Sequence, residues 1–232
     1  MKQDNIESEI KERFNELSDI FPDSIETSDF RVSAVLKFFG NIKGKKVLDV
    51  GCGKGRFSKI MADKGAITTG IDPSEKMIED AKKIKNANFI LGSATKLNFP
   101  DKSFDYVLSV EAVEHIPETE KAVKEMIRVL KDNGKIVIID KNILSLRVFF
   151  KVIPTFNFIN KKIQEVRNKW MYPQNFPFKE KWFFSWSIDK MLKKYCTNTE
   201  FEYLHDNLSY KGSVSFKHFP FLNLFIIWKG VK

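Results

Sequence analysis

The length, composition and charge of the chain exclude several classes of protein. Its 232 residues, 43% of them hydrophobic, suit one α/β domain with a substantial core and a modest insertion, but not two full domains. Two cysteines make no disulfide framework, so we expect a reducing, cytoplasmic location. No apolar run approaches the roughly 18 residues that a membrane span needs.

The net charge of +9 is unevenly distributed along the chain. Residues 1–140 carry 23 basic and 24 acidic side chains, whereas residues 141–232 carry 16 and 6. All four tryptophans and 13 of the 22 phenylalanines also lie in the second part. The chain therefore divides into a nearly neutral part and a basic, aromatic part that could face an anionic or apolar partner.

Two amphipathic helices are predicted before the first strand. Residues 5–21 carry apolar side chains three or four positions apart, and Pro22 ends the pattern. Residues 29–39 repeat it, with Asp29 as a candidate N-cap and Gly40 as a C-terminal signal.

The stretch from Val47 to Ser58 predicts a buried strand, a glycine-rich turn and the start of a helix. A dinucleotide fingerprint would need a third glycine at position 56, where this chain has Arg56. Asp49, two residues before the first glycine, would repel a pyrophosphate and attract a ligand with positive charge. The turn thus predicts a small cationic ligand.

Alternating strand and helix patterns continue after this turn. We expect helices at 57–64, from 74 onward, at 119–130 and at 186–195, and strands at 66–72, 88–92, 104–110, 135–140, 200–205 and 222–229, with a turn at Asn133-Gly134. Asp72, at the end of the second strand, can accept hydrogen bonds from both hydroxyls of a ribose. A helix-capping role is its alternative.

The run Leu48-Asp49-Val50-Gly51-Cys52-Gly53-Lys54-Gly55 resembles motif I of the class I S-adenosylmethionine-dependent methyltransferases, including the type 11 and quinone-pathway members that act on small molecules. The resemblance implies a Rossmann-like sandwich with a mostly parallel seven-stranded sheet and an antiparallel last strand. It divides the single domain into N-terminal helices that cover the cleft (1–43), a cofactor-binding core (44–141), a substrate-facing insertion (142–187), and a C-terminal helix with edge strands (188–232). For the second N-terminal helix, packing outside the sheet is the alternative.

The resemblance also implies S-adenosylmethionine as cofactor and S-adenosylhomocysteine as product. Ser93 replaces the acid that usually meets the adenine amino group, so this contact would lack charge assistance. Met77 would lie against adenine or simply pack in the core. The implied cofactor-binding residues are Asp49, Gly51, Cys52, Gly53, Gly55, Asp72, Pro73, Met77, Ser93, Ala94, Val110 and Glu111.

The segment after the fourth strand is a candidate for chemistry, because ligands of open α/β sheets bind beyond the carboxyl ends of the strands. His115 could take a proton from a hydroxyl nucleophile. Glu111, Glu114 and His115 could instead hold a divalent metal, as a similar pattern does in some quinone-pathway and RNA-end methyltransferases. They could also only shape the cofactor pocket.

The methyl acceptor is expected in the insertion, with Asn142, Trp170, Tyr172 and Trp182 as candidate contacts. A packed lid whose aromatic residues face the core is the alternative. We expect methyl transfer to oxygen of a small molecule or of a lipid- or sugar-linked acceptor with an apolar body or an anionic group. RNA methylation ranks lower, because the basic residues lie among bulky apolar ones. A regulatory subunit that binds the cofactor without catalysis is a further alternative, and peripheral membrane contact is compatible with the composition.

Overall fold

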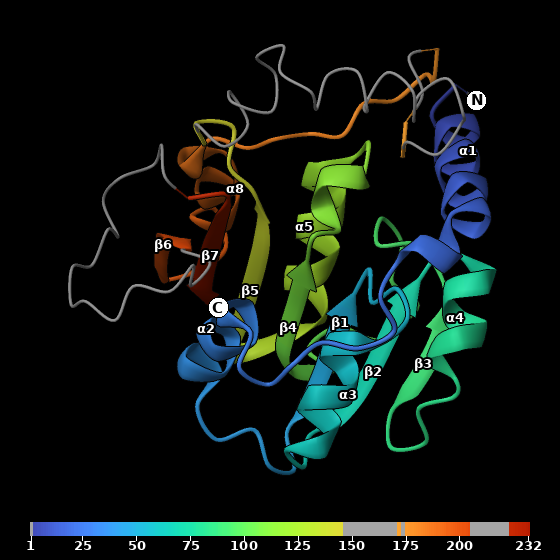
Figure 1. Cartoon of the computed structure of the whole chain (residues 1–232). Coiled ribbons are helices and arrows are strands. Elements are labelled where there is room, and N and C mark those ends of the chain that lie inside the picture. Colours follow the sequence, from blue (N-terminus) through green and yellow to red (C-terminus); the bar gives the residue numbers. More distant parts are fainter. Residues whose placement is uncertain (1, 146–170, 173–174, 205–222) are drawn as a thin grey trace.

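A seven-stranded sheet organises the chain in a computed structural model that describes residues 2–145, 171–172, 175–204 and 223–232 (Figure 1). The strands lie in the order β3-β2-β1-β4-β5-β7-β6. Their bounds are β1 Lys46–Val50, β2 Ile67–Asp72, β3 Asn88–Leu91, β4 Phe104–Val110, β5 Leu130–Lys141, β6 Asn198–Leu204 and β7 Phe225–Val231. The helices are α1 Lys2–Glu16, α2 Phe30–Phe39, α3 Arg56–Asp63, α4 Glu75–Ala81, α5 Thr119–Val129 and α8 Ser185–Leu192, with short 3₁₀ turns η1 Ser18–Ile20 and η2 Val113–His115.

The strand directions confirm the predicted sheet. The pairs β1 with β2, β2 with β3, β1 with β4 and β4 with β5 are parallel. The last strand of the chain, β7, lies antiparallel between β5 and β6. The strand order reverses between β1 and β4, and in open α/β sheets this point is where ligands bind.

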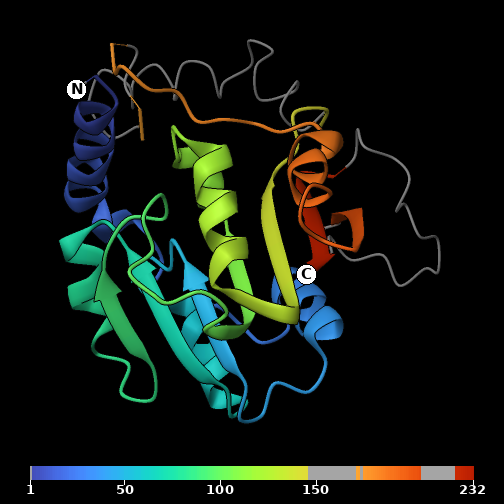
Figure 2. The same ribbon diagram turned by 180° about the vertical axis from the view of Figure 1, so that it is seen from behind.

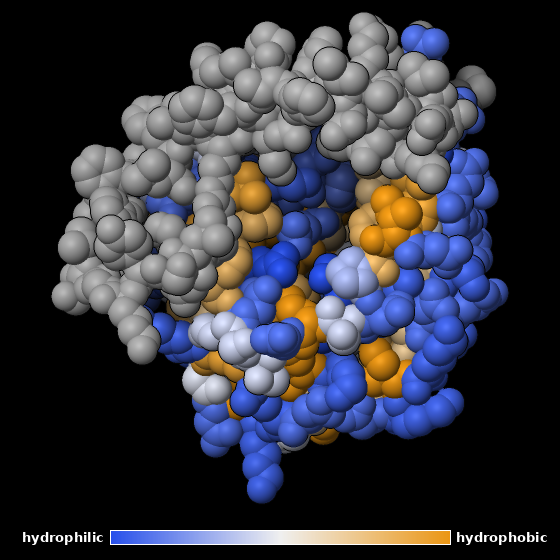
Figure 3. Space-filling view, in the orientation of Figure 1, coloured by the Kyte–Doolittle hydropathy of each residue, from blue (hydrophilic) through white to orange (hydrophobic). Residues whose placement is uncertain are grey.

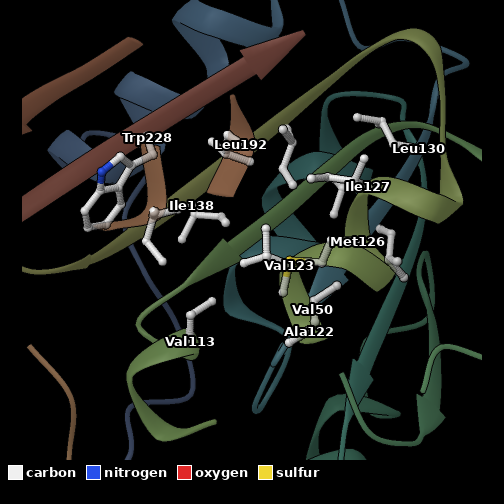
Figure 4. Close-up of a cluster of buried hydrophobic side chains, with 14 of the residues drawn as sticks. Val50, Val113, Ala122, Val123, Met126, Ile127, Leu130, Ile138, Leu192 and Trp228 are labelled. Carbon is white, nitrogen blue, oxygen red and sulfur yellow. The ribbon is translucent and has the colours of Figure 1, made fainter. Parts of the chain in front are cut away.

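Helices cover both faces of the sheet (Figures 1 and 2). One face packs against α2 and α3, with Phe39 and Met61 fully buried there. The other packs against α5 and α8, where Met126 and Trp228 are fully buried in a cluster that Figure 4 draws. Burying each such side chain contributes about 1.5–3 kcal/mol or more to the stability of the fold. The two helical layers therefore hold the sheet, and with it the strand ends, in place.

The N-terminal helix α1 is fastened to α4 at the edge of the fold. Lys11 pairs with Glu75 at 2.6 Å between Nζ and Oε1. The amide of Asn15 accepts a hydrogen bond from the Ser74 hydroxyl at 2.7 Å and donates one to Glu75 at 3.1 Å. These contacts place α1 as a cover beside the carboxyl ends of the strands, as the resemblance implied.

The second helix, α2, has the predicted cap and packs on the sheet. Asp29 accepts a hydrogen bond from the Arg31 backbone N–H at 2.8 Å, and Gly40 follows the last turn with φ of 76°. Its buried face, Val32, Val35 and Phe39, belongs to the sheet core. The alternative of outside packing is therefore correct for this helix, although its first turn also reaches the cleft.

The start of β5 differs from the prediction. The strand begins at Leu130 rather than Lys135, because Leu130 pairs with Phe104 before the register shifts. Asn133 keeps the left-handed conformation that a turn needs, with φ of 59°, and its backbone N–H donates to the Lys232 carbonyl. The predicted turn is thus an irregularity within a longer strand.

In the described ranges no helix is long and apolar enough to cross a membrane.

We predict that Asn15→Ala loosens α1 without unfolding the domain. The substitution removes hydrogen bonds to Ser74 and Glu75 but leaves the sheet core intact, so hydrogen exchange of the α1 amides should accelerate several-fold while the melting temperature falls only slightly. Asn5→Ala is the matched control, because among the described residues the Asn5 side chain bonds to Glu9 of the same helix alone. Equal exchange in both variants would contradict the fastening role.

Candidate active site

A cavity of about 1020 Å³ lies at the carboxyl ends of β1, β2 and β4. Its walls come from α1, the glycine turn, the ends of β2 and β4, and η2. Figure 3, drawn in the orientation of Figure 1, shows a recess in the middle of the molecule, with hydrophilic residues between apolar ones. The volume is at the upper end of the range for small-molecule sites.

The glycine turn gives the cavity a wall of bare backbone. Gly51, Gly53 and Gly55 all have positive φ, which L side chains rarely adopt. A Cβ on Gly51 would overlap the side chain of Ala112, so the turn and η2 approach as closely as their backbones allow. A Cβ on Gly53 would meet only open space. A ligand can therefore lie directly on this backbone.

Asp49 lies beneath the turn as a buried carboxylate. Its Oδ2 accepts a hydrogen bond from the Ser58 hydroxyl at 2.6 Å. Burial raises the pKa of Asp49 to about 6 despite this bond. A positively charged ligand group would favour the ionised form, which matches the cationic ligand predicted from the sequence.

Asp72 closes the turn from the end of β2. Its Oδ2 accepts a hydrogen bond from the Gly53 backbone N–H at 2.9 Å, and its Oδ1 accepts one from Ser74 at 2.9 Å. Burial raises its pKa to about 6. Each carboxylate oxygen can still accept a further bond, which is what two ribose hydroxyls require. The capping role and the ribose role are therefore compatible.

Most of the predicted cofactor-binding residues line this cavity. Gly55 does not line it, and a Cβ at this position would meet the ring of Phe89 and the side chain of Ile84. The hydroxyl of Ser93 lies 2.8 Å from that of Thr95, so part of its hydrogen-bonding capacity is used within the chain. The cavity is lined by Asp49, Gly51, Cys52, Gly53, Asp72, Pro73, Met77, Ser93, Ala94, Val110 and Glu111, together with His115.

His115 has both ring nitrogens occupied. Nε2 lies 3.2 Å from Glu114 Oε1, and Nδ1 lies 2.9 Å from the Tyr172 hydroxyl. Because an ionised carboxylate only accepts, Nε2 is the donor to Glu114, and Nδ1 lies within hydrogen-bond distance of the Tyr172 hydroxyl. Burial and the charges of Glu180 and Glu114 raise the pKa of Tyr172, so its hydroxyl stays protonated.

A chain of buried ion pairs continues behind His115. Lys141 Nζ lies 2.8 Å from Glu114 Oε1 and also binds Glu180. Burial alone would raise the pKa of Glu114, but His115 and Lys141 outweigh it and hold the pKa below its usual range. Asp140 is fully buried, and burial raises its pKa well above the ordinary value. Glu114 is thus fixed as a charged anchor for the imidazole.

The structure does not assemble the suggested metal ligands. Arg31 binds Glu111 Oε2, whereas Glu114 binds Lys141 and His115. Within the described part of the chain, no group of three or more His, Cys, Asp and Glu side chains is arranged to hold a metal ion. Glu111 and the Glu114–His115 pair are therefore held by different partners.

The candidate acceptor contacts fall in different places. Asn142 is fully buried and bonds to the Asn223 carbonyl and the Leu144 N–H, so it holds the end of β5 together. Trp182 donates to Glu180 at 3.0 Å and does not line the cavity. Tyr172 touches His115 but is itself buried. Trp170 lies outside the described residues.

Sequence analysis missed several residues that line the cavity. Ile10 and Phe14 were recognised only as the apolar face of a helix, and Arg31 and Arg56 carried no motif of their own. Their places depend on how α1, α2 and α3 meet the sheet. One sequence feature could have pointed to Arg31 as a cavity residue: it is a charged residue next to the buried face of an amphipathic helix.

The strand order, the glycine turn and the two buried aspartates define a class I methyltransferase fold. A family model described as a methyltransferase domain matches residues 48–138. The demethylmenaquinone methyltransferase of Staphylococcus aureus is 35% identical over 189 residues, which cover 74% of this chain and 77% of that protein. The chain belongs to the class I S-adenosylmethionine-dependent methyltransferases, and its cofactor is S-adenosylmethionine.

Solved structures share this fold. A possible histamine N-methyltransferase from Thermotoga maritima has a TM-score of 0.61 at 17% identity and covers 96% of this chain and 99% of its own. A phosphoethanolamine N-methyltransferase from Haemonchus contortus, solved with S-adenosylhomocysteine, has a TM-score of 0.55 at 26% identity and covers 73% of this chain and 37% of its own.

Asp72→Ala should weaken binding of S-adenosylhomocysteine at least tenfold in calorimetry, because it removes two charge-assisted acceptors for the ribose. Asp63→Ala is a matched control that deletes a carboxylate from the exposed end of α3, outside the cavity. Unchanged affinity in Asp72→Ala would remove the ribose assignment.

The same assignment sets a pH dependence. Ribose hydroxyls donate to the ionised carboxylate, so affinity should be constant above about pH 6 and fall by up to about tenfold per unit below it. Asp72→Asn should flatten this profile, with any residual slope coming from Asp49.

Proposed function

We propose that the chain transfers a methyl group to a hydroxyl of a small molecule with an apolar or aromatic body. The observation that carries the proposal is the apolar lining of the cavity at the end beyond the glycine turn. There His115 lies among apolar side chains from three separate segments, Phe14, Ile116 and Met171. The ring of Phe14 packs edge-on against His115, with centroids 5.1 Å apart. A flat apolar acceptor suits such walls.

The relative from Staphylococcus aureus supports the same class of acceptor, because its name states that it acts on demethylmenaquinone. The charges support a small molecule over RNA. Beyond residue 140, most lysines of the described segments already have partners within the chain, namely Lys141, Lys181, Lys193, Lys194, Lys229 and Lys232. The four that pair with carboxylates, Lys141, Lys193, Lys194 and Lys229, have little net charge left for a phosphate backbone.

His115 is the proposed proton acceptor. The cofactor, when bound, would supply a methyl group on a sulfonium. Most of the residues predicted to bind it line the same cavity as His115. As the acceptor oxygen gains the methyl group, it loses its proton to His115 Nδ1, and Glu114 stabilises the resulting imidazolium through Nε2. The acceptor hydroxyl must first replace the Tyr172 hydroxyl at Nδ1.

The activity is tested with S-adenosylmethionine labelled in its methyl group. Hydroquinones and phenols with apolar side chains should become labelled, with the label at oxygen in the isolated product. Bulk RNA and water-soluble amines are the comparison acceptors. Labelling of RNA alone, or of no acceptor in the presence of tight cofactor binding, would contradict the proposal.

The role of His115 is tested with a pair of variants. His115→Ala should lower kcat about 10²-fold or more and leave affinity for S-adenosylhomocysteine nearly unchanged, because general base catalysis is lost while the glycine turn is intact. Tyr172→Phe keeps the aromatic contacts with Phe178 but leaves Nδ1 unoccupied, so it should retain turnover and lower KM for the acceptor.

Together, the two variants distinguish between two roles of His115, as the group that accepts the proton and as a residue that only positions others. If Tyr172→Phe lost as much turnover as His115→Ala, the hydrogen-bonded pair itself would be what the enzyme needs, and His115 would be a positioning residue.

A further inference from the structure

Lys181 binds the chain on both sides of His115. Its backbone N–H donates to the carbonyl of Glu114 at 2.9 Å, and its ammonium donates to the carbonyl of Ile116, also at 2.9 Å. The ammonium has two further acceptors in the next few residues, namely the Pro117 carbonyl at 2.6 Å and the Thr119 hydroxyl at 2.8 Å. All three protons of the ammonium therefore have acceptors, and the histidine lies between two of the carbonyls that Lys181 holds.

The ammonium of Lys181 is kept in this place at a cost. Burial lowers its pKa, and it forms no ion pair with a carboxylate of the described residues. It also contacts Thr119, the first residue of α5, where the positive end of the helix dipole disfavours a cation. Its three hydrogen bonds offset these costs, and together they fix the acceptors relative to one another. The effect of this lysine is therefore a rigid turn around His115.

The residues on either side of Lys181 fasten their segment to the same end of the cavity. Glu180 binds the ammonium of Lys141, which also binds the Glu114 carboxylate. The backbone N–H of Phe183 donates to the Lys141 carbonyl at 3.0 Å, so the segment is joined to the end of β5. These contacts do not involve the Lys181 ammonium. Its loss should therefore release the η2 turn and leave the segment in place.

We propose that Lys181 is a positioning residue for methyl transfer, which orients the imidazole of His115 by holding the backbone on both sides of it. This role rests on the proposed function, in which His115 takes the proton of the acceptor hydroxyl. Lys181 does not line the cavity, so it acts through the turn and not on a ligand. A misplacement of about 1 Å can cost about 10²-fold in rate. Turnover should therefore depend on Lys181, whereas affinity for the cofactor should not.

The first test is kinetic. Lys181→Met keeps a long side chain and removes all three donors, so kcat for a phenol acceptor should fall about tenfold or more while the affinity for S-adenosylhomocysteine stays unchanged. Lys181→Arg keeps the charge and several donors and should recover part of kcat. Lys194→Met is the matched control, because Lys194 pairs with the exposed Glu120 of α5, and it should change neither value.

The second test does not depend on the acceptor. The ring-nitrogen NMR signals of His115, assigned by comparison with His115→Ala, should be sharp in the wild type and in Lys194→Met. In Lys181→Met they should shift or broaden, because the ring samples several orientations. Lys181→Gln keeps a donor on a shorter side chain and should give an intermediate spectrum, so the comparison remains available if Lys181→Met does not fold.

Three results would overturn the proposal: unchanged imidazole signals in the Lys181 variants, an unchanged kcat, or a loss of cofactor affinity as large as the loss of kcat. In the last case Lys181 would support the whole site and not His115 in particular. A wild-type protein that labels no hydroxyl acceptor would refute the proposed function alone, because the NMR comparison would still show whether Lys181 orients His115.

Discussion

The close approach of the Gly51 turn to Ala112 is the constraint on which the site depends. Because Gly51 has no side chain, the backbone of the turn after β1 packs directly on the Ala112 side chain in the turn after β4, at the point where the strand order reverses. This contact fixes the distance between the cofactor wall and η2, and hence between the glycine turn and His115. Methyl transfer depends on such alignment, which can be worth about 7–11 kcal/mol of a reaction barrier.

The site is assembled at a cost to folding. Asp49 and Asp72 each have a pKa raised by burial to about 6, roughly two units above that of a free aspartate, and each unit is worth about 1.4 kcal/mol. For an acid with a raised pKa, the folded protein loses stability as the pH rises through the range from about 4 to 6, and the cost is full above it. Ligand hydrogen bonds and positive charge reverse this effect, so cofactor binding should stabilise the fold markedly at neutral pH.

The sequence allowed most of the sheet, the N-cap at Asp29 and the cofactor wall to be predicted, because these features depend on residues close together in the chain. The glycine turn, Asp49 and Asp72 lie within 24 residues of one another. The features that sequence analysis missed join distant segments: Arg31 with Glu111, His115 with Tyr172, and Lys141 with Glu180. No local pattern encodes such pairs. The start of β5 was missed for the same reason, since Leu130 is in a strand only because Phe104 lies beside it.

The polar chain at the acceptor end limits which acceptors fit. Glu114 and Glu180 share one cation, Lys141, beside the imidazole. The two carboxylates at this end of the cavity therefore outnumber the cation that binds them. A hydroxyl or amine that donates a hydrogen bond is favoured there, and a phosphate or carboxylate adjacent to the reacting atom is disfavoured. The basic composition of residues 141–232 had suggested an anionic group on the acceptor, and such a group would have to lie away from His115. The ion pairs around this histidine therefore say more about the acceptor than the net charge of the chain does.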